Sequence, residues 1–252
     1  MKKFIIIGIG FLLLVFVISA INSFKGNPIS KLLAKKAAGR YIEEQYSNLD
    51  LEIKKSYYNF KFKHYGVVVQ SNTSEDTCFT IYTDELGNID HDDYENMVVN
   101  NFNTWIRLNQ ELDESANELI SSKLDYTFDT VSIKFFENSK NNQDLLKLQK
   151  DMKLNIKNPP LPLELYVVVF TEEVSYSKIA EVAKAIEKVL KDHSIPIESY
   201  SVRLIPMSDK PKNENEAVSW VNSIAVNNFP HELMSEKNLP DVMEEYELSN
   251  WN

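Results

Sequence analysis

The sequence contains little cysteine and little glycine, and each shortage excludes a class of site. Its single cysteine, Cys78, can form neither an internal disulfide nor a thiolate metal cage. The six glycines all lie within the first 87 residues. Loops that cradle phosphate need glycine for close approach of the backbone, so the sequence has no P-loop and no dinucleotide-binding fingerprint. The one Gly-x-Gly pattern, Gly8 and Gly10, lies inside an apolar run and indicates helix packing.

Basic residues are also in the minority. The formal net charge is −10, and a surface of that sign repels nucleic acid, whose recognition needs clustered Lys and Arg. We therefore expect no nucleic-acid partner. The composition is otherwise that of a folded chain, with 43% hydrophobic and 25% charged residues. Its 252 residues suffice for one or two domains.

A long uncharged run opens the chain. Residues 4–21 would span about 27 Å as a helix, which is close to the ~30 Å hydrocarbon core of a bilayer. Two lysines before the run suit both a retained signal-anchor and a cleaved signal peptide. The run is longer than a typical signal-peptide core, and cleavage after Ala20 would place bulky Ile18 at the −3 position. We therefore predict a retained, single-pass membrane anchor, with cleavage as the alternative.

The orientation of this anchor depends on two opposing signals. A short N-terminal tail with two lysines usually stays inside the cell, which would leave the rest of the chain outside. The positive-inside rule would instead draw inward the basic residues that follow the run. They are Lys25, Lys31, Lys35, Lys36 and Arg40. We expect an extracytoplasmic body, and the orientation stays open.

The stretch after the anchor predicts a helix, a small antiparallel sheet and a second helix. Asn27-Pro28 opens the first helix, because Asn caps well and Pro is tolerated in the first turn. Alternating residues predict strands at 56–63 and 77–83, with a run of valines between them. Apolar residues three and four apart predict a long helix over about 92–122. The expected apolar stripe of the first helix consists of Ile29, Leu32, Leu33, Ala37 and Tyr41.

The second half predicts a sheet interleaved with helices. In chain order the expected elements are a strand at 131–135, a helix at about 142–152, a buried strand at 165–170, a helix at 176–191, a strand at 200–204 and a helix at about 214–228. The succession of strand, helix and strand predicts a crossover between parallel strands. From His231 onward the chain is acidic, and it either frays or docks as a short amphipathic helix.

Together these elements predict an α+β fold. We expect an N-terminal transmembrane helix, then a helix–antiparallel sheet–helix domain of cystatin-like or PepSY-like shape, and a second small α/β domain. The predicted divisions are 1–24 for the anchor, 25–123 for the first domain, 124–230 for the second and 231–252 for an acidic tail.

Four segments resemble a known family. They are NPISKLLAKKAAGRYIEEQY (27–46), YYNFKFKHYGVVVQS (57–71), CFTIYTDELG (78–87) and FNTWIRLNQEL (102–112). They are similar to the YfjL-like family of membrane-anchored proteins of low-GC Gram-positive bacteria, most clearly over residues 1–122. The resemblance implies an N-terminal helix–sheet–helix domain and a separate C-terminal domain. It brings no assigned activity and no catalytic residue to this sequence.

The densest polar cluster suggests calcium but departs from the calcium-loop rule. It comprises Asp84, Glu85, Asn88, Asp90, His91, Asp92 and Asp93. Three of these residues have the spacing of loop ligands, but Asp93 stands where the loop needs glycine and Val99 where it needs the closing Glu. We interpret the acidic residues instead as a cap, Asp90, and as charges that complement the start of the long helix.

The remaining polar candidates have structural explanations. The four histidines share no zinc-ligand spacing; they are His64, His91, His193 and His231. No G-x-S-x-G motif is present, and Cys78 fits a small buried thiol of a strand. Glu43-Glu44 and Glu172-Glu173 could pair as acid and base across a cleft, but adjacent side chains point apart. We assign no catalytic, cofactor-binding or metal-binding residue, and no cofactor.

The sequence therefore predicts a membrane-anchored envelope protein that acts as a non-enzymatic binding or interaction module. The expected partners are the membrane, through residues 4–21, and a protein. Two alternatives stay open: an envelope hydrolase with a dispersed carboxylate site, and a regulatory module that faces the cytoplasm. The ligand, the pathway and the oligomeric state are not predicted.

Overall fold

The computed structural model describes residues 13, 17, 22–136, 144–213 and 216–250 of the chain. The predicted anchor, residues 4–21, lies outside the described residues apart from Leu13 and Val17. No helix in the described part of the chain is both long and apolar enough to cross a bilayer. The fold is mixed α+β and contains two four-stranded sheets.

The chain divides into two units, each with its own sheet. Unit 1 comprises residues 1–104 and 149–151, and unit 2 comprises residues 105–148 and 152–252. The division near residue 104 falls early in a helix that extends to Lys123. The sequence-based boundary at 123/124 lies at the far end of that helix.

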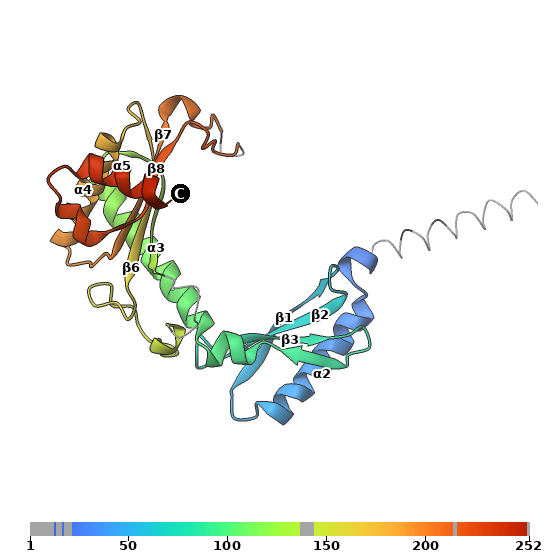
Figure 1. Cartoon of the computed structure of the whole chain (residues 1–252). Helices are drawn as coiled ribbons and strands as arrows, with labels where there is room; N and C mark the ends of the chain where they lie inside the picture. Colours follow the sequence, from blue (N-terminus) through green and yellow to red (C-terminus); the bar gives the residue numbers. More distant parts are fainter. Residues whose placement is uncertain (1–12, 14–16, 18–21, 137–143, 214–215, 251–252) are drawn as a thin grey trace, which may run out of the picture. The chain divides into compact units, whose positions relative to one another are not determined.

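Unit 1 is a four-stranded antiparallel meander covered on one face by a helix (Figure 1). The helix is α2 (Pro28–Gln45), and the strands are β1 (Leu51–Asn59), β2 (His64–Ser71), β3 (Cys78–Thr83) and β4 (Ile89–Asp92). The predicted antiparallel meander is confirmed, with β4 as an additional strand. Alternate side chains of β2 and β3, such as Val67, Val69 and Ile81, are buried against α2.

The start of α2 is as predicted, but its buried face is not. The Asn27 side chain accepts a hydrogen bond from the Ile29 N–H at 2.9 Å, and Pro28 occupies the first turn. The predicted apolar stripe is wrong at Ile29, Leu32 and Leu33, which are exposed. The residues that pack on the sheet are small: Ser30, Ala34, Ala37 and Ala38, with Ile42 in the last turns. Alanines let the helix approach the bulky strand side chains closely, which the size of the leucines would prevent.

The long helix predicted over 92–122 is broken. Residues up to Asp92 belong to β4, a short π-helix follows (η1, Glu95–Val99), and α3 (Phe102–Lys123) begins after Asn101. Asn101 has a φ of +59°, a left-handed conformation that Asn tolerates and that ends helical continuity. Val98 packs in the core of unit 1, whereas the apolar stripe of α3 packs in unit 2. The helical spacing of apolar residues therefore holds before and after Asn101, but it does not reveal the break between the two helical segments.

The strand predicted at 56–63 ends early. β1 stops at Asn59, and residues 60–63 form the tip of the hairpin to β2, where Lys63 adopts a φ of +55°. The alternation of Tyr58, Phe60 and Phe62 therefore does not describe one strand, because both phenylalanines lie beyond its end and are exposed. Asn59 turns the chain, since its Oδ1 accepts the Lys61 N–H at 3.1 Å.

A short return of the chain completes unit 1. The Asp151 N–H donates to Asp76 Oδ2 at 2.7 Å, and the Asp76 N–H donates to Asp151 Oδ1 at 3.0 Å. Asp76 is buried and also accepts the Thr104 hydroxyl at 2.8 Å. Residues 149–151 are thereby fixed to the β2–β3 loop although they lie far along the chain.

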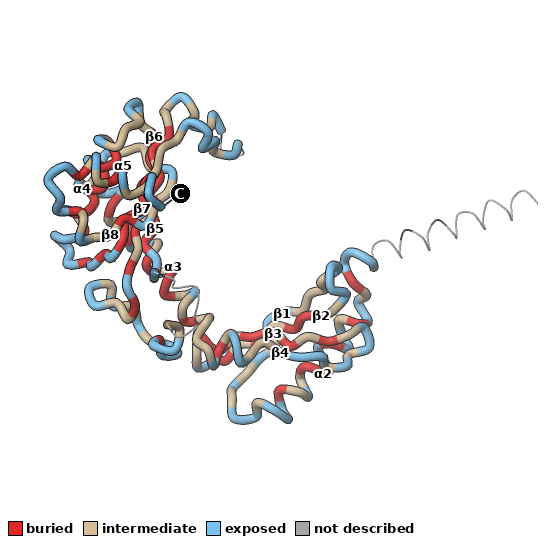
Figure 2. The backbone as a smooth tube through the Cα atoms, viewed as in Figure 1, coloured by how far each residue is buried: buried red, intermediate tan, exposed pale blue. Residues whose placement is uncertain are grey.

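Unit 2 is a mixed sheet with helices on one face. Its further elements are β5 (Thr127–Phe135), η2 (Leu145–Lys147), β6 (Leu163–Thr171), α4 (Tyr176–Asp192), β7 (Ser199–Pro206), η3 (Met207–Asp209), β8 (Ile224–Pro230), η4 (His231–Ser235) and α5 (Leu239–Asn250). The strand order is β5-β6-β7-β8, and only β6 and β7 run parallel, joined by α4. The predicted parallel pair is thus confirmed. Figure 2 shows the buried residues concentrated along these strands and the helix sides that face them.

Two predicted helices of unit 2 are wrong and the tail is ordered. Over 144–152 the described residues form only the 3-10 turn η2. The first two residues of the predicted helix, 142 and 143, lie outside the described part of the chain. The helix predicted at 214–228 is strand β8 from Ile224, antiparallel to β7. The acidic tail docks: α5 packs on α4 and β8 and buries Leu239 and Met243.

The glycines of unit 1 provide a matched pair of substitutions. Gly26 has a φ of +75°, and a Cβ there would lie 2.5 Å from the Tyr58 Cβ, whereas a Cβ on Gly39 in α2 meets nothing within 4 Å. We expect Gly26→Ala to lower the free energy of unfolding by about 1–3 kcal/mol, from strain and steric overlap. Gly39→Ala should raise it by roughly 0.5–1 kcal/mol through helix propensity. Denaturant titration of both variants checks this, and equal effects would contradict the described packing of Gly26.

Candidate functional site

The acidic residues between Asp84 and Asp93 are used in separate local interactions. Asp84 closes the β3–β4 turn, because its carboxylate accepts the Leu86 and Asn88 N–H groups at 2.8 and 2.9 Å. Hydrogen bonds from the Asn88 side chain and backbone hold the pKa of Asp84 below its ordinary value. Asp90 lies in β4 and pairs with the neighbouring His91 ring, so it does not cap a helix as predicted. Among the described residues, no group of three or more His, Cys, Asp or Glu side chains could hold a metal ion.

The other two aspartates of the cluster are used within the fold. Asp92 Oδ2 accepts the hydroxyls of Tyr41 and Tyr46 at 2.9 and 2.8 Å, which ties α2 to β4. Burial, followed by the bond to Asp92, raises the pKa of both tyrosines. Asp93 accepts the Thr80 N–H and the Tyr82 hydroxyl, and burial raises its pKa. These carboxylates stabilise the edge of the sheet.

Cys78 and two of the histidines lie on or near the strands of unit 1 and do not share a site. Cys78 is half-buried, and burial, followed by the charge of Asp93, raises the pKa of its thiol. His64 and His91 both contact the Tyr82 ring, at centroid distances of 4.8 and 4.6 Å. The glutamates that were interpreted as solvated surface, Glu43-Glu44 and Glu172-Glu173, are all exposed.

An ionic cluster in unit 2 surrounds Glu187, a buried residue of α4. The Glu187 side chain is 6% exposed and accepts Lys184 Nζ at 2.9 Å and Lys191 Nζ at 2.8 Å. His231 Nδ1 lies 3.8 Å from the same carboxylate and 3.3 Å from the Tyr200 hydroxyl. Burial alone would raise the pKa of Glu187, but the hydrogen bonds from the two lysines outweigh it and hold the pKa below its ordinary value. The cluster connects α4 to the chain that follows β8.

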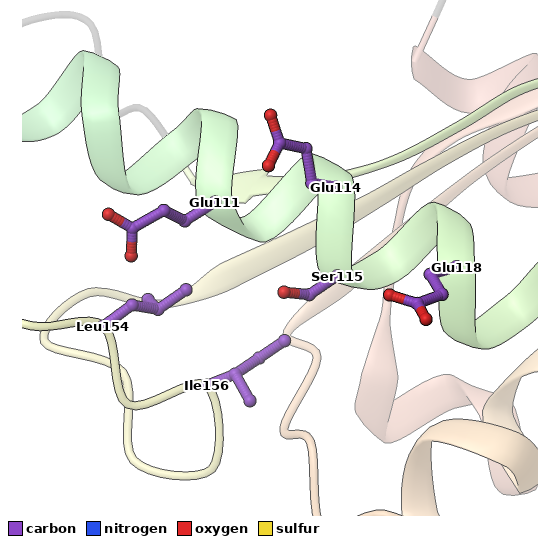
Figure 3. A pocket seen from close by; sticks show the side chains of 6 residues that line it. All are labelled: Glu111, Glu114, Ser115, Glu118, Leu154 and Ile156. Carbon is purple, nitrogen blue, oxygen red and sulfur yellow. The ribbon is translucent and has the colours of Figure 1, made fainter.

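An open groove of about 400 Å³ lies between α3 and the extended segment that follows residue 152. Its polar side consists of Glu111, Glu114, Ser115 and Glu118 of α3, and its apolar side consists of Leu154 and Ile156. Figure 3 shows Glu111, Ser115 and Glu118 on the side of the helix that faces this loop, whereas Glu114 points away from it in this view. We call this feature the α3 groove.

The packing of α3 fixes the α3 groove. Leu108, Leu112 and Ala116 are fully buried in the core of unit 2, so the glutamates between them must face outward. Arg107 joins the two sides: it donates to Glu111 Oε1 at 2.7 Å and to the Met152 carbonyl at 2.8 Å. Leu154 and Ile156 pack on the same core at their inner sides. The result is a surface that is anionic along one wall and aliphatic along the other.

Comparison with known families can now be added to this geometry. The model of the YfjL-like N-terminal domain matches residues 1–93, and the model of the YfjL-like C-terminal domain matches residues 111–244. This chain belongs to the YfjL-like family. The family prediction made from the sequence is thereby confirmed. No curated protein and no solved structure matches the chain.

All side chains of the α3 groove lie within the YfjL-like C-terminal domain. The sequence contained a signal for one wall, since Glu111, Glu114 and Glu118 are three and four residues apart and share a helix face. It contained none for the other wall, because Leu154 and Ile156 reach α3 only through the fold. None of the polar side chains weighed as candidates for a site from the sequence alone lines this groove.

Two further hollows are less distinctive in this YfjL-like chain. One, of about 530 Å³, is lined by Arg40, Tyr41 and Glu44 of α2 and by residues 87–89. Its charges are mixed, and the Tyr41 hydroxyl is already bonded to Asp92. The other, of about 650 Å³, lies around Phe170 and Lys210, whose ammonium is 5.9 Å from the Phe170 ring. The α3 groove is the hollow in which one sign of charge faces an apolar wall.

The Glu187 cluster makes stability depend on pH in a defined direction. The pKa of Glu187 is lower in the folded chain than the ordinary value of 4.5, so its contribution is present above that pH and is lost as the pH falls through the folded pKa. We expect Glu187→Gln to cost about 1–3 kcal/mol at neutral pH and progressively less below pH ~4.5. Urea unfolding across this range measures the difference.

Glu181 is the matched control on the same helix. It pairs with Lys178 at 2.7 Å but its side chain is 57% exposed, so Glu181→Gln should change the free energy of unfolding by no more than about 0.5 kcal/mol. A cost for Glu187→Gln that is constant from acid to neutral pH would show that packing, and not charge, explains its effect.

Proposed function

We propose that this YfjL-like chain is a single-pass membrane protein of the cell envelope that acts as a non-enzymatic binding module. Residues 4–21 are the anchor, the body is extracytoplasmic, and the α3 groove holds a basic, amphipathic segment of a partner protein. The observation that carries the binding role is the opposition of Glu111 and Glu118 to two aliphatic side chains across the groove.

The membrane part of the proposal rests on the sequence of the first 21 residues. Residues 4–21 carry no charge, and in hydrocarbon a continuous helix is the state that satisfies every backbone N–H and carbonyl. At ~1.5 Å per residue they match the thickness of the hydrocarbon core. Lys2 and Lys3 would remain on the cytoplasmic side, which leaves both units outside the cell.

The chemistry of the α3 groove favours a cationic and partly apolar partner. Carboxylates along one wall attract Lys and Arg, and the aliphatic wall adds apolar area that a free cation or polyamine would not cover. Two exposed lysines of the loop, Lys153 and Lys157, flank the segment that contains Leu154 and Ile156. They form no ion pair with the groove glutamates in the part of the chain that the structure describes.

The exposure of the glutamates favours binding over acid–base catalysis. A hydrolase that uses two carboxyl groups needs one of them held protonated, which is usually achieved by burial in apolar surroundings. Glu114 and Glu118 are exposed, and Glu111 is partly exposed and bonded to Arg107. Exposed carboxylates of this kind are accessible to a cationic partner.

The binding role is tested by reversing charge in the α3 groove. A fluorescent peptide of alternating lysine and leucine is titrated against the full chain in nanodiscs. We expect Glu111→Lys with Glu118→Lys to weaken its binding about tenfold, as if each carboxylate contributed ~0.7 kcal/mol. Fluorescence anisotropy at two salt concentrations measures the affinity and its electrostatic part.

The matched control reverses two exposed glutamates of α2, Glu43→Lys with Glu44→Lys, which alters the net charge equally. Binding should be nearly unchanged in this control. If both double variants weaken binding to the same degree, net charge explains the attraction and the groove has no role.

The anchor is tested separately. We expect the full chain to float with membranes after an alkaline carbonate wash, and a variant without residues 4–21 to stay in solution, because the run supplies the apolar area that holds the chain in lipid. Added protease should digest the body on intact cells. Recovery of a shortened chain from the culture medium would establish cleavage, and a protected body would establish the cytoplasmic orientation.

A further inference from the structure

The point at which the predicted anchor enters unit 1 is held rigidly. Residues 22–25 are helical, and the Gly26 N–H closes this turn by donating to the Asn22 carbonyl at 2.9 Å. Gly26 packs so closely on Tyr58 that no Cβ fits, and the Asn27 N–H donates to the Tyr65 hydroxyl at 2.8 Å. The chain therefore joins unit 1 at the end of the sheet where β1 turns into β2.

Three exposed phenylalanines gather at this end. Phe24 is 67% exposed, and in the β1–β2 turn Phe60 is 51% and Phe62 is 72% exposed. The Phe24 and Phe60 rings contact each other at a centroid distance of 6.0 Å. Exposed aromatic side chains in a cluster, as opposed to scattered ones, indicate a surface that contacts an apolar phase or partner.

The first turns of α2 extend the same apolar surface. Ile29 and Leu32 are more than two-thirds exposed, and they lie on the side of the helix opposite the buried Ala34 and Ala38. The outward side of later turns is charged, with Lys36, Arg40 and Glu43. The apolar residues on the outside of α2 are thus confined to its beginning, next to Gly26.

The β3–β4 turn lies at this end as well. In the antiparallel register, Thr83 and Ile89 are level with Tyr65 and Tyr58, so residues 84–88 turn at the same end as the β1–β2 hairpin. Leu86 at its tip is 70% exposed, and Gly87 lies against the Leu33 backbone. We call these exposed apolar residues, Phe24, Ile29, Leu32, Phe60, Phe62 and Leu86, the hairpin end.

Exposed lysines are interspersed with the phenylalanines of the hairpin end. Lys25 follows Phe24, and Lys61 and Lys63 flank Phe62. The nearby carboxylates are Asp84, which is bonded within its turn, and Glu85. Aromatic rings beside lysines are the combination found at membrane–water interfaces, where the ring enters the headgroup layer and the ammonium reaches anionic lipid.

We propose that the hairpin end of unit 1 docks on the surface of the bilayer that holds the anchor, with its apolar side chains in the headgroup layer and its lysines on anionic lipid. This rests on the membrane anchor proposed above. The connection is short: Phe24 is three residues beyond Ile21, which at ~3.5 Å per residue is at most about 11 Å of chain. Unit 1 then rests on the membrane surface and does not move freely on a flexible linker.

Chain continuity and charge favour lipid over a protein as the occupant. Any membrane anchor that ends at residue 21 brings Phe24 to the interface, and the fixed Gly26 turn brings the β1–β2 tip with it. The lysines match the negative surface of bacterial lipids. Transfer of several apolar side chains and lysines together gives stable interfacial contact, whereas one alone would be marginal.

The test uses the full chain in vesicles of phosphatidylcholine and phosphatidylglycerol, with Cys78→Ser as background. An environment-sensitive fluorophore is attached at Phe62→Cys or at Leu86→Cys, and spin-labelled lipid serves as quencher. We expect a blue shift and loss of most fluorescence at both positions. The control label at Asn72→Cys, an exposed position in the loop at the opposite end of the sheet, should not be quenched.

The charge contribution is tested with Lys61→Glu and Lys63→Glu together, read at the label on position 86. Quenching should fall severalfold in anionic vesicles, whereas Lys54→Glu with Lys55→Glu in β1 should leave it unchanged. Quenching that is the same in phosphatidylcholine alone would refute the role of the lysines.

The two proposals fail in different ways. If the labelled chain does not float with vesicles after the carbonate wash, the anchor is wrong and the docking falls with it. If the chain floats but labels at 62 and 86 are as unquenched as the label at 72, the anchor stands and the docking is overturned.

Discussion

The burial of one apolar stripe of α3 determines which side chains of this helix are exposed on the surface of unit 2. Leu108, Leu112, Ala116 and Ile120 are fully buried, and a helix with one face fixed in this way has no freedom to rotate. The glutamates between these residues are therefore held outward at defined positions along the axis. Arg107 then draws the Met152 carbonyl to the same helix, which completes the groove. The packing of this apolar stripe thus determines the geometry of the polar wall of the α3 groove.

Unit 1 reverses the usual use of large and small apolar residues. Its helix packs alanines against the sheet, while leucine, isoleucine and phenylalanine side chains at one end are left in contact with solvent. Leaving so much apolar area exposed forfeits burial energy, at roughly 25 cal/mol per Å². Such a cost is maintained when the exposed area has another phase to enter, and this is the physical reason to connect the hairpin end with lipid.

Much of the fold could be predicted from local pattern, and the failures share one cause. The strands predicted at 77–83 and 165–170, the parallel pair across α4 and the Asn27 cap follow from alternation, apolar runs, period and turn chemistry, and the structure contains all of them. The stripe of α2, the continuity of 92–122 and the state of 224–230 do not, because each depends on which core receives a given side chain. Leu32 has helical spacing whether it faces inward or outward. The segment from Ile224 forms a strand because it pairs with β7, and this pairing is a tertiary contact that local pattern does not reveal. The α3 groove was missed for the same reason, since Leu154 is brought to Glu111 by tertiary structure alone.

The paired aspartates Asp76 and Asp151 have a consequence for how this protein can be divided. Because residues 149–151 complete unit 1 while the chain on both sides of them belongs to unit 2, neither unit is a contiguous stretch of polypeptide. A fragment that stops at Thr104 would lose the hydrogen bonds that Asp151 exchanges with Asp76, a buried group. Gene fusions, crystallisation fragments and domain exchanges made from this chain would therefore have to carry this short return segment.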